Sequence, residues 1–228
     1  MDAAPWSKKQ QAFYWHAPQH ASAGGRRQHA KLAAFRAAKR FAVPSSALAH
    51  PPRWLNATQL HPAPAPLLRD WLFGQDSLTR RLTVLSAGRF AVQPLEQGWQ
   101  NLRQDECSAL QIPRGSQGWV REVFLQGAGD NWVFARSVAA RSALEGSGLD
   151  LGKLGSRSLG ELLFSDRAFV RGELQVCRYP AAWLPSAVRA EQLWGRRSCF
   201  RRDGLAVLVA EVFLPAFWVH AGQPLTAH

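Results

Sequence analysis

A single acidic residue lies inside an apolar stretch near the C-terminus. Residues 205–219 read LAVLVAEVFLPAFWV, and Glu211 is the one charged residue among them. In an extended strand, Glu211 would share a side with Val207, Val209 and Phe213, and the opposite side is apolar as well. Burying an unpaired charge costs several kcal/mol even after relaxation. The fold must therefore bring a partner or a ligand to this carboxylate.

A second apolar stretch, WVREVFLQG at 119–127, contains Arg121 on the side of its tryptophan and leucine. Two interpretations follow for Arg121 and Glu211: they form an internal salt bridge, or both face a closed polar cavity that holds a ligand. Arginine suits a carboxylate, which it binds through two parallel hydrogen bonds. Glutamate suits a hydroxyl or an ammonium. Glu122 points to the other side of its strand, and we expect a structural role for it. Arg136 shares a strand side with apolar neighbours, so its charge also needs a partner.

Turn residues predict two β-hairpins. The segments 118–126 and 131–139 flank Gly-Ala-Gly-Asp, and the segments 194–202 and 205–214 flank Asp-Gly. Further strands are expected at 81–93 and 169–177, a helix at 65–73, and short helices or turns at 141–148 and 158–164. Hairpins require antiparallel pairing, so we predict an α+β domain with one antiparallel sheet and helices on one face.

Positive charge is concentrated at the N-terminus. The 228 residues carry a net charge of +12, and residues 1–50 hold eight Lys or Arg against one acidic residue, a net +7. We interpret 1–50 as a flexible, solvated extension and 51–228 as the folded domain. A pI near 10.9 raises the alternatives of a nucleic acid or an anionic membrane as partner, or of a transit peptide. No nucleic-acid recognition motif is visible, so we expect no nucleic-acid partner.

The three cysteines, Cys107, Cys177 and Cys199, form no CxxC spacing. Their odd number and wide separation argue against a disulfide framework and a structural zinc site, and favour a reducing cytoplasm. The apolar stretch at 205–219 is shorter than the ~20 residues that span a bilayer and contains Glu211 and Pro215, so we expect a buried strand and no transmembrane segment.

Histidine is absent between residues 62 and 219. This distribution excludes a Ser-His-Asp or Cys-His arrangement and a histidine metal site from that region. No P-loop or dinucleotide fingerprint occurs either. An enzyme built on this chain would work without metal, nucleotide or nucleophilic triad, by positioning, by cationic binding of an anion and by exclusion of water.

Six blocks of sequence, in this order, resemble bacterial chorismate pyruvate-lyases. They are DWLFGQDSLTRRL (70–82), WVREVFLQG (119–127), NWVFARSV (131–138), LGKLGSRSLGELLF (151–164), WGRRSCF (194–200) and LAVLVAEVFLPA (205–216). The resemblance runs from about residue 52 to 217 and leaves 1–50 without a counterpart. It implies a six-stranded antiparallel sheet with helices packed on it and an internal ligand site under flaps.

The resemblance also implies an activity: a lyase that converts chorismate to 4-hydroxybenzoate and pyruvate without a cofactor, as the first step of ubiquinone biosynthesis. We expect a monomer. The alternative is a non-catalytic, sensor-like domain that binds aromatic acids on the same fold. WGRRS (194–198) is interpreted either as solvated strand charges or as a basic patch that attracts a dianionic substrate.

Four site residues carry over from the family motifs. Arg121 matches the arginine that binds the substrate carboxylate, and Glu211 matches the buried glutamate, so both are assigned to catalysis and substrate binding. Leu78 and Leu159 match positions that contact the ligand through the main chain. Ser158 stands where the family has proline, which puts the local stiffness of that flap in question.

Overall fold

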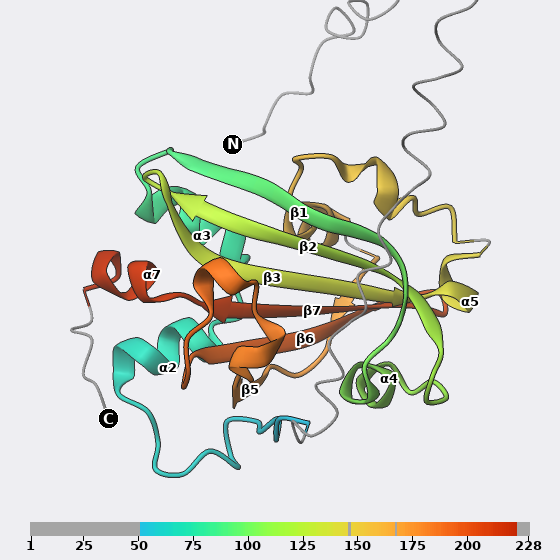
Figure 1. Cartoon of the computed structure of the whole chain (residues 1–228), viewed down its shortest axis with the longest axis horizontal. Helices are drawn as coiled ribbons and strands as arrows, with labels where there is room; N and C mark the ends of the chain where they lie inside the picture. The colour runs from blue at the N-terminus through green and yellow to red at the C-terminus, as the bar shows by residue number, and fades with distance from the viewer. Residues whose placement is uncertain (1–50, 146, 167, 223–228) are drawn as a thin grey trace, which may run out of the picture. The chain divides into compact units, whose positions relative to one another are not determined.

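The computed structural model describes residues 51–222, except 146 and 167. The predicted extension at 1–50 lies outside this range. The strands form one antiparallel sheet in the order β1-β2-β3-β7-β6-β4, with β5 also paired to β6. Figure 1 shows β1, β2, β3, β7 and β6 side by side in this order. The strands are β1 (Phe90–Asn101), β2 (Gln117–Gly127), β3 (Asp130–Ala140), β4 (Val170–Arg171), β5 (Gln175–Arg178), β6 (Trp194–Arg202) and β7 (Leu205–Phe213). The predicted α+β class is confirmed.

Short helices connect and cover these strands. They are α2 (Pro66–Phe73), α3 (Leu78–Leu85), α4 (Gln104–Leu110), α5 (Arg141–Leu144), α6 (Leu159–Ser165) and α7 (Pro215–His220), with 3₁₀ turns η2 (Leu151–Leu154), η3 (Ala181–Trp183) and η4 (Ser186–Val188). No helix in the described part of the chain is long and apolar enough to cross a membrane.

Both predicted hairpins are confirmed, because each has a two-residue loop with positive φ at both positions. Ala128 (φ 55°) and Gly129 (φ 98°) connect β2 to β3, and Asp203 (φ 45°) and Gly204 (φ 82°) connect β6 to β7. Loops of this kind match the twist of the flanking strands. They fix which residues stand opposite one another across each hairpin.

The strand expected at 81–93 is wrong in its first half, where the chain forms helix α3. The hydroxyl of Ser77 caps this helix by accepting a hydrogen bond from the backbone N–H of Arg80. Leu78 and Leu82, four residues apart, then bury the same helix side. The cap and this burial outweigh the strand preference of the β-branched residues.

The predicted count of six strands is also wrong, because the edge segment at 169–177 is two strands. Arg171 pairs with Phe200 and Gln175 pairs with Arg197. Phe200 and Arg197 are three positions apart on β6, whereas their partners Arg171 and Gln175 are four positions apart. The extra residue breaks the ladder near Gly172 into β4 and β5, and the sheet has seven strands.

Apolar side chains cover the sheet on both faces. The helical face, which carries Val123, Ala135 and Val209, packs against α2, α3, α6 and α7. The α4 face, which carries Val120, Val138 and Leu208, packs against the buried side of α4. The expectation of helices on one face describes α2, α3, α6 and α7, whereas α4 lies on the other. Sequence reasoning missed α4 and α7. Strand β7 ends at Phe213 because helix α7 follows, with Pro215 at its first position.

Candidate active site

Arg121 and Glu211 lie on the same face of the sheet, as the cavity interpretation requires. Arg121 on β2 stands opposite Ser137 on β3, and Glu211 on β7 stands opposite Ala135. Two strand spacings and a two-residue offset separate their Cα atoms by roughly 12 Å. Both belong to the helical face, because Ala135 packs in its core cluster. The small side chains of Ala135 and Ser137 form the floor between the two charged groups.

Arg121 is almost fully buried, and its hydrogen-bond acceptors in the described part of the chain are all neutral. Its guanidinium donates to Oε1 of Gln97 (3.1 Å) and to the carbonyls of Gly155 (2.7 Å) and Arg157 (3.1 Å). Among the described residues no carboxylate forms an ion pair with it, so the predicted alternative of an Arg121–Glu211 salt bridge is wrong. Burial lowers the pKa of Arg121. The site therefore holds a desolvated cation without a counter-ion among residues 51–222 as the structure describes them, which suits a ligand carboxylate.

The carboxylate of Glu211 is paired instead with Arg196, its direct neighbour across the β6–β7 hairpin. Nε of Arg196 donates to Oε2 of Glu211 at 2.7 Å, and Nη1 donates to the carbonyl of Trp71 at 2.8 Å. Arg196 is completely buried, whereas the Glu211 side chain keeps 14% of its surface accessible. Within the described range no hydrogen bond reaches Oε1 of Glu211. One carboxylate oxygen is thus held by the protein and the other is free for a ligand.

Sequence reasoning missed Arg196 as the partner of Glu211, although the hairpin contains the signal. A two-residue loop at 203–204 puts Arg202 opposite Leu205, and counting back in steps of one puts Arg196 opposite Glu211. The interpretation of WGRRS as solvated charges is wrong for Arg196 and Arg197. Both are buried, on opposite faces of the sheet.

Leu78 and Leu159 are the first residues of α3 and α6, and both are buried. The hydroxyls of Thr79 and Ser158 lie 2.7 Å apart and connect the starts of the two helices. Ser158 caps α6 by accepting from the N–H of Glu161 at 3.3 Å, at the position where the resemblance led us to expect a proline. A serine at this position therefore still fixes where the helix begins.

A pocket of about 970 Å³ opens between α3, α6 and the start of β1. Its lining includes Thr79, Arg157 and Ser158, which are neighbours of the predicted site residues. Arg121, Glu211, Leu78 and Leu159 themselves are not part of the lining. The pocket thus lies beside the starts of the two helices, and Arg157 in its lining also contacts Arg121 through its carbonyl.

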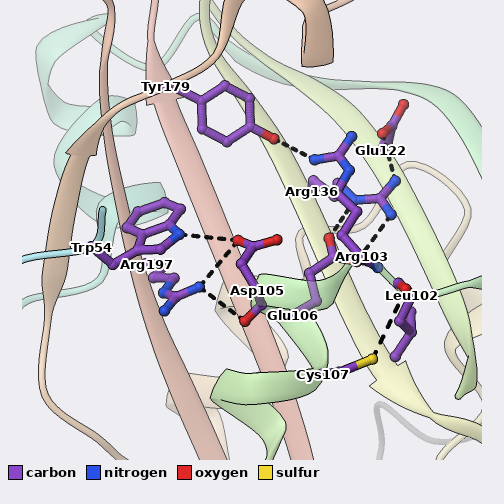
Figure 2. Close-up of polar contacts among 10 residues, drawn as sticks. All are labelled: Trp54, Leu102, Arg103, Asp105, Glu106, Cys107, Glu122, Arg136, Tyr179 and Arg197. Carbon is purple, nitrogen blue, oxygen red and sulfur yellow. Dashed lines mark hydrogen bonds and ion pairs between the residues drawn. The ribbon is translucent and has the colours of Figure 1, made fainter. Parts of the chain in front are cut away.

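The α4 face carries a second polar cluster, built around Arg136 (Figure 2). Its guanidinium donates to Glu106 at 2.7 Å and to Glu122 at 2.8 Å. This arrangement supplies the compensation that Arg136 needs and gives Glu122 the structural contact expected for it. Burial by itself would raise the pKa of Glu106, but the charges and hydrogen bonds of Arg136 and Arg103 together outweigh burial and hold that pKa below its ordinary value.

Two further contacts extend this cluster across the α4 face (Figure 2). Arg103 donates to the hydroxyl of Tyr179 at 2.7 Å, and Arg197 lies 3.2 Å from a carboxylate oxygen of Asp105. The same oxygen accepts from the indole of Trp54 at 3.0 Å. These contacts fix α4 to the sheet, and none of them involves the four predicted site residues.

Comparison with known proteins gives consistent matches over the described domain. The profile of a family described as Chorismate lyase matches residues 48–223. A "Probable chorismate pyruvate-lyase" from Pseudomonas aeruginosa (strain UCBPP-PA14) is 64% identical over 180 residues, which are 79% of this chain and 98% of that protein. One from Pseudomonas syringae pv. syringae (strain B728a) is 67% identical over 165 residues, 72% of this chain and 89% of that protein.

Solved structures of transcriptional regulators also align with part of the chain, at low similarity. The PhnF C-terminal domain is 16% identical with a TM-score of 0.45, over 54% of this chain and 82% of that one. The C-terminal domain of the histidine utilization repressor from Pseudomonas syringae pv. tomato str. DC3000 is 9% identical with a TM-score of 0.44, over 61% of this chain and 98% of that one.

Proposed function

The chain belongs to the chorismate lyase family, and we propose that it converts chorismate to 4-hydroxybenzoate and pyruvate without a cofactor. Chorismate carries a ring carboxylate, a ring hydroxyl and an enolpyruvyl ether with a second carboxylate. In the reaction the ring carbon–oxygen bond of the ether breaks and a ring hydrogen is lost. Pyruvate takes the ether oxygen and a hydrogen with it, and the ring becomes aromatic.

In this proposal Arg121 binds the ring carboxylate. The observation that carries the assignment is a buried guanidinium with neutral acceptors and no ion pair to a described residue. A carboxylate would supply the missing counter-charge and accept charge-assisted hydrogen bonds from the N–H groups on Nε and Nη1 that no described residue uses. The ring would then extend over the small floor residues Ala135 and Ser137 toward β7.

Glu211 accepts a hydrogen bond from the ring hydroxyl at the opposite end. Its Oε2 is held by Arg196, which fixes the carboxylate and leaves Oε1 for the ligand. The separation of roughly 12 Å between the two Cα atoms, spanned by two long side chains, suits a six-membered ring with polar groups at opposite ends. Leu78 and Leu159 contribute main-chain contacts, an assignment that rests on the resemblance.

Catalysis in this proposal comes from positioning. A ring held at both ends keeps the ether in one orientation, and burial of Arg121 strengthens its electrostatic contact with the carboxylate. Aromatisation supplies the driving force. The protein's contribution is therefore a reactive conformation held in a site that excludes water.

The decisive experiment is incubation of the purified protein with chorismate. We expect 4-hydroxybenzoate and pyruvate to appear in equal amounts, with an unchanged rate after dialysis against a strong chelator. Binding of 4-hydroxybenzoate without pyruvate release would instead support the sensor-like alternative. A rate lost on chelation and restored by a divalent ion would refute the cofactor-free part of the proposal.

We also propose a place and state for the enzyme: a cytoplasmic monomer that supplies 4-hydroxybenzoate to ubiquinone biosynthesis. Cys107, Cys177 and Cys199 are all free thiols, which fits a reducing compartment. Light scattering on the purified protein tests the monomer. Restoration of ubiquinone in a strain that lacks its own chorismate lyase tests the pathway.

A further inference from the structure

Arg171 is a third arginine on the helical face that reaches the same polar region. It lies on β4 opposite Phe200, and its Nε donates to the hydroxyl of Ser198 at 2.9 Å. Ser198 is two residues from Arg196 on β6 and shares its face. Nη1 of Arg171 donates to the carbonyl of Gln75 at 3.0 Å. The guanidinium is therefore fixed next to the Arg196–Glu211 pair.

Aromatic rings hold this guanidinium further in place. Its central carbon lies 5.4 Å from the centre of the Phe164 ring and 5.5 Å from that of Phe200. At such distances the face of an aromatic ring attracts a positively charged group electrostatically. An arginine held by two hydrogen bonds and two rings loses little freedom on binding a ligand, which is the property of a prepared site.

The charge of Arg171 is left without an ion pair in the described part of the chain. Its two hydrogen-bond acceptors, Ser198 and Gln75, are neutral, and no bond to a described residue uses Nη2. Burial, followed by the nearby charge of Arg196, lowers the pKa of Arg171 to about 10, and Glu211 opposes this shift. The group is still protonated at neutral pH and has N–H donors available for an anion.

The chemistry of the substrate indicates which anion belongs here. The ether carbon of chorismate is bonded to the carbon that carries the hydroxyl, so the enolpyruvyl carboxylate lies at the hydroxyl end of the ring. That is the end assigned to Glu211. We propose, as an extension of the proposed function, that Arg171 binds the enolpyruvyl carboxylate of chorismate through its free N–H groups.

The two carboxylates of the substrate then have separate cations on the same face. Four paired residues form one row across the sheet: Arg121 on β2, Ser137 on β3, Val209 on β7 and Ser198 on β6. Arg121 is at one end of this row, and Ser198, which accepts a hydrogen bond from Arg171, is at the other. Arg121 contacts a group that the product retains. Arg171 contacts a group that leaves with pyruvate, so it distinguishes the substrate from the product.

This difference sets the experiment. In Arg171→Gln the KM for chorismate should rise about tenfold or more, because a charge-assisted hydrogen bond is lost. The Kd for 4-hydroxybenzoate, measured by calorimetry, should stay within about twofold of the parent value. Arg201→Gln is the matched control, since Arg201 is exposed on the neighbouring strand and should change neither quantity.

Ser198→Ala provides a second variant that removes only the hydroxyl that orients Arg171, and it should raise the KM by a smaller factor. An unchanged KM in Arg171→Gln would overturn the proposal. An equal loss of affinity for 4-hydroxybenzoate would also overturn it, because it would show a merely structural role. If the parent protein released no pyruvate, the proposed function would fail. Calorimetry with chorismate and with 4-hydroxybenzoate would then still test Arg171.

Discussion

Arg196 and Glu211 face each other across a two-residue hairpin and form an ion pair of 2.7 Å in which the arginine is completely buried. The carboxylate inside the apolar strand is therefore compensated by the preceding strand of the same hairpin. Arg196 also holds the carbonyl end of α2 through Trp71. The pair thus joins the sheet to the segment that leads into α3.

Removal of Arg196 alone should destabilise the protein strongly. Arg196→Met leaves Glu211 without its cation, and breaking a buried pair in this way costs roughly 3–5 kcal/mol in the free energy of unfolding. The double variant Arg196→Met with Glu211→Leu should recover much of that loss. Urea unfolding of the three proteins measures both steps, and a double variant as unstable as the single one would contradict the expectation.

Arg121→Lys should impair ligand binding more than stability. Lysine keeps the charge but loses the planar guanidinium with its several N–H donors, and no ion pair to a described residue is lost. We expect the Kd for 4-hydroxybenzoate to weaken by about tenfold with a small change in Tm. Arg141→Lys, at an exposed ion pair with Glu145, is the control. A parent-like Kd in Arg121→Lys would show that the assignment of Arg121 is wrong.

Glu211→Gln should fold and yet bind 4-hydroxybenzoate less tightly. Glutamine keeps the shape, but its single carbonyl oxygen can accept at the position that Arg196 holds or at the position that faces the ligand hydroxyl, and its NH2 group occupies the other. A charge-assisted hydrogen bond is roughly twice as strong as a neutral one. Thermal melting with and without 4-hydroxybenzoate, together with pyruvate release, checks this. Turnover and ligand-induced stabilisation equal to those of the parent would assign Glu211 a structural role only.

Glu106 should make the stability of the protein dependent on acidic pH. The pKa of Glu106 in the folded protein lies below its ordinary value of 4.5. Its contribution is therefore complete above 4.5 and is lost as the pH falls through the folded-state pKa. Urea unfolding from about pH 7 to about pH 3 should show a shallower pH dependence for Glu106→Gln than for the parent. Glu145→Gln, an exposed carboxylate, should keep the parent's slope.

A shortened chain that begins at Pro51 should keep its kcat, because residues 1–50 lie almost entirely before the region that matches the family. A tenfold fall in kcat with intact folding would show that the N-terminal residues take part in the reaction.

Gel shifts with both chains test the remaining nucleic-acid alternative. Binding by the full chain alone would locate it in residues 1–50.

The parts of the fold that sequence predicted are those fixed by local geometry. Asp203 and Gly204 are a pair that two-residue hairpin loops favour, and Ala128 and Gly129 also form such a loop with positive φ at both residues. The order of distant strands is not encoded locally, so the neighbours of Glu211 could not be read from its own segment. This is why the salt bridge with Arg121 was an open alternative, although β3 separates the two strands.

Helix α4 was missed for a related reason. Its seven residues, QDECSAL, are mostly polar, and its capping box depends on the side chain of Glu106. Glu106 also pairs with Arg136 on β3, a contact between distant parts of the chain. Only the folded sheet brings these groups together, so the partner of Arg136 could not be identified from the sequence.

The break between β4 and β5 has a consequence for self-association. A long, flat edge strand exposes a row of backbone donors and acceptors on which another chain can pair. On one side of the sheet this row is interrupted near Gly172 by the extra residue. On the other side, β1 contains Pro94, which lacks an N–H, and a register shift between Pro94 and Glu96. Neither edge is a continuous template, and the sheet is thereby protected against edge-to-edge aggregation.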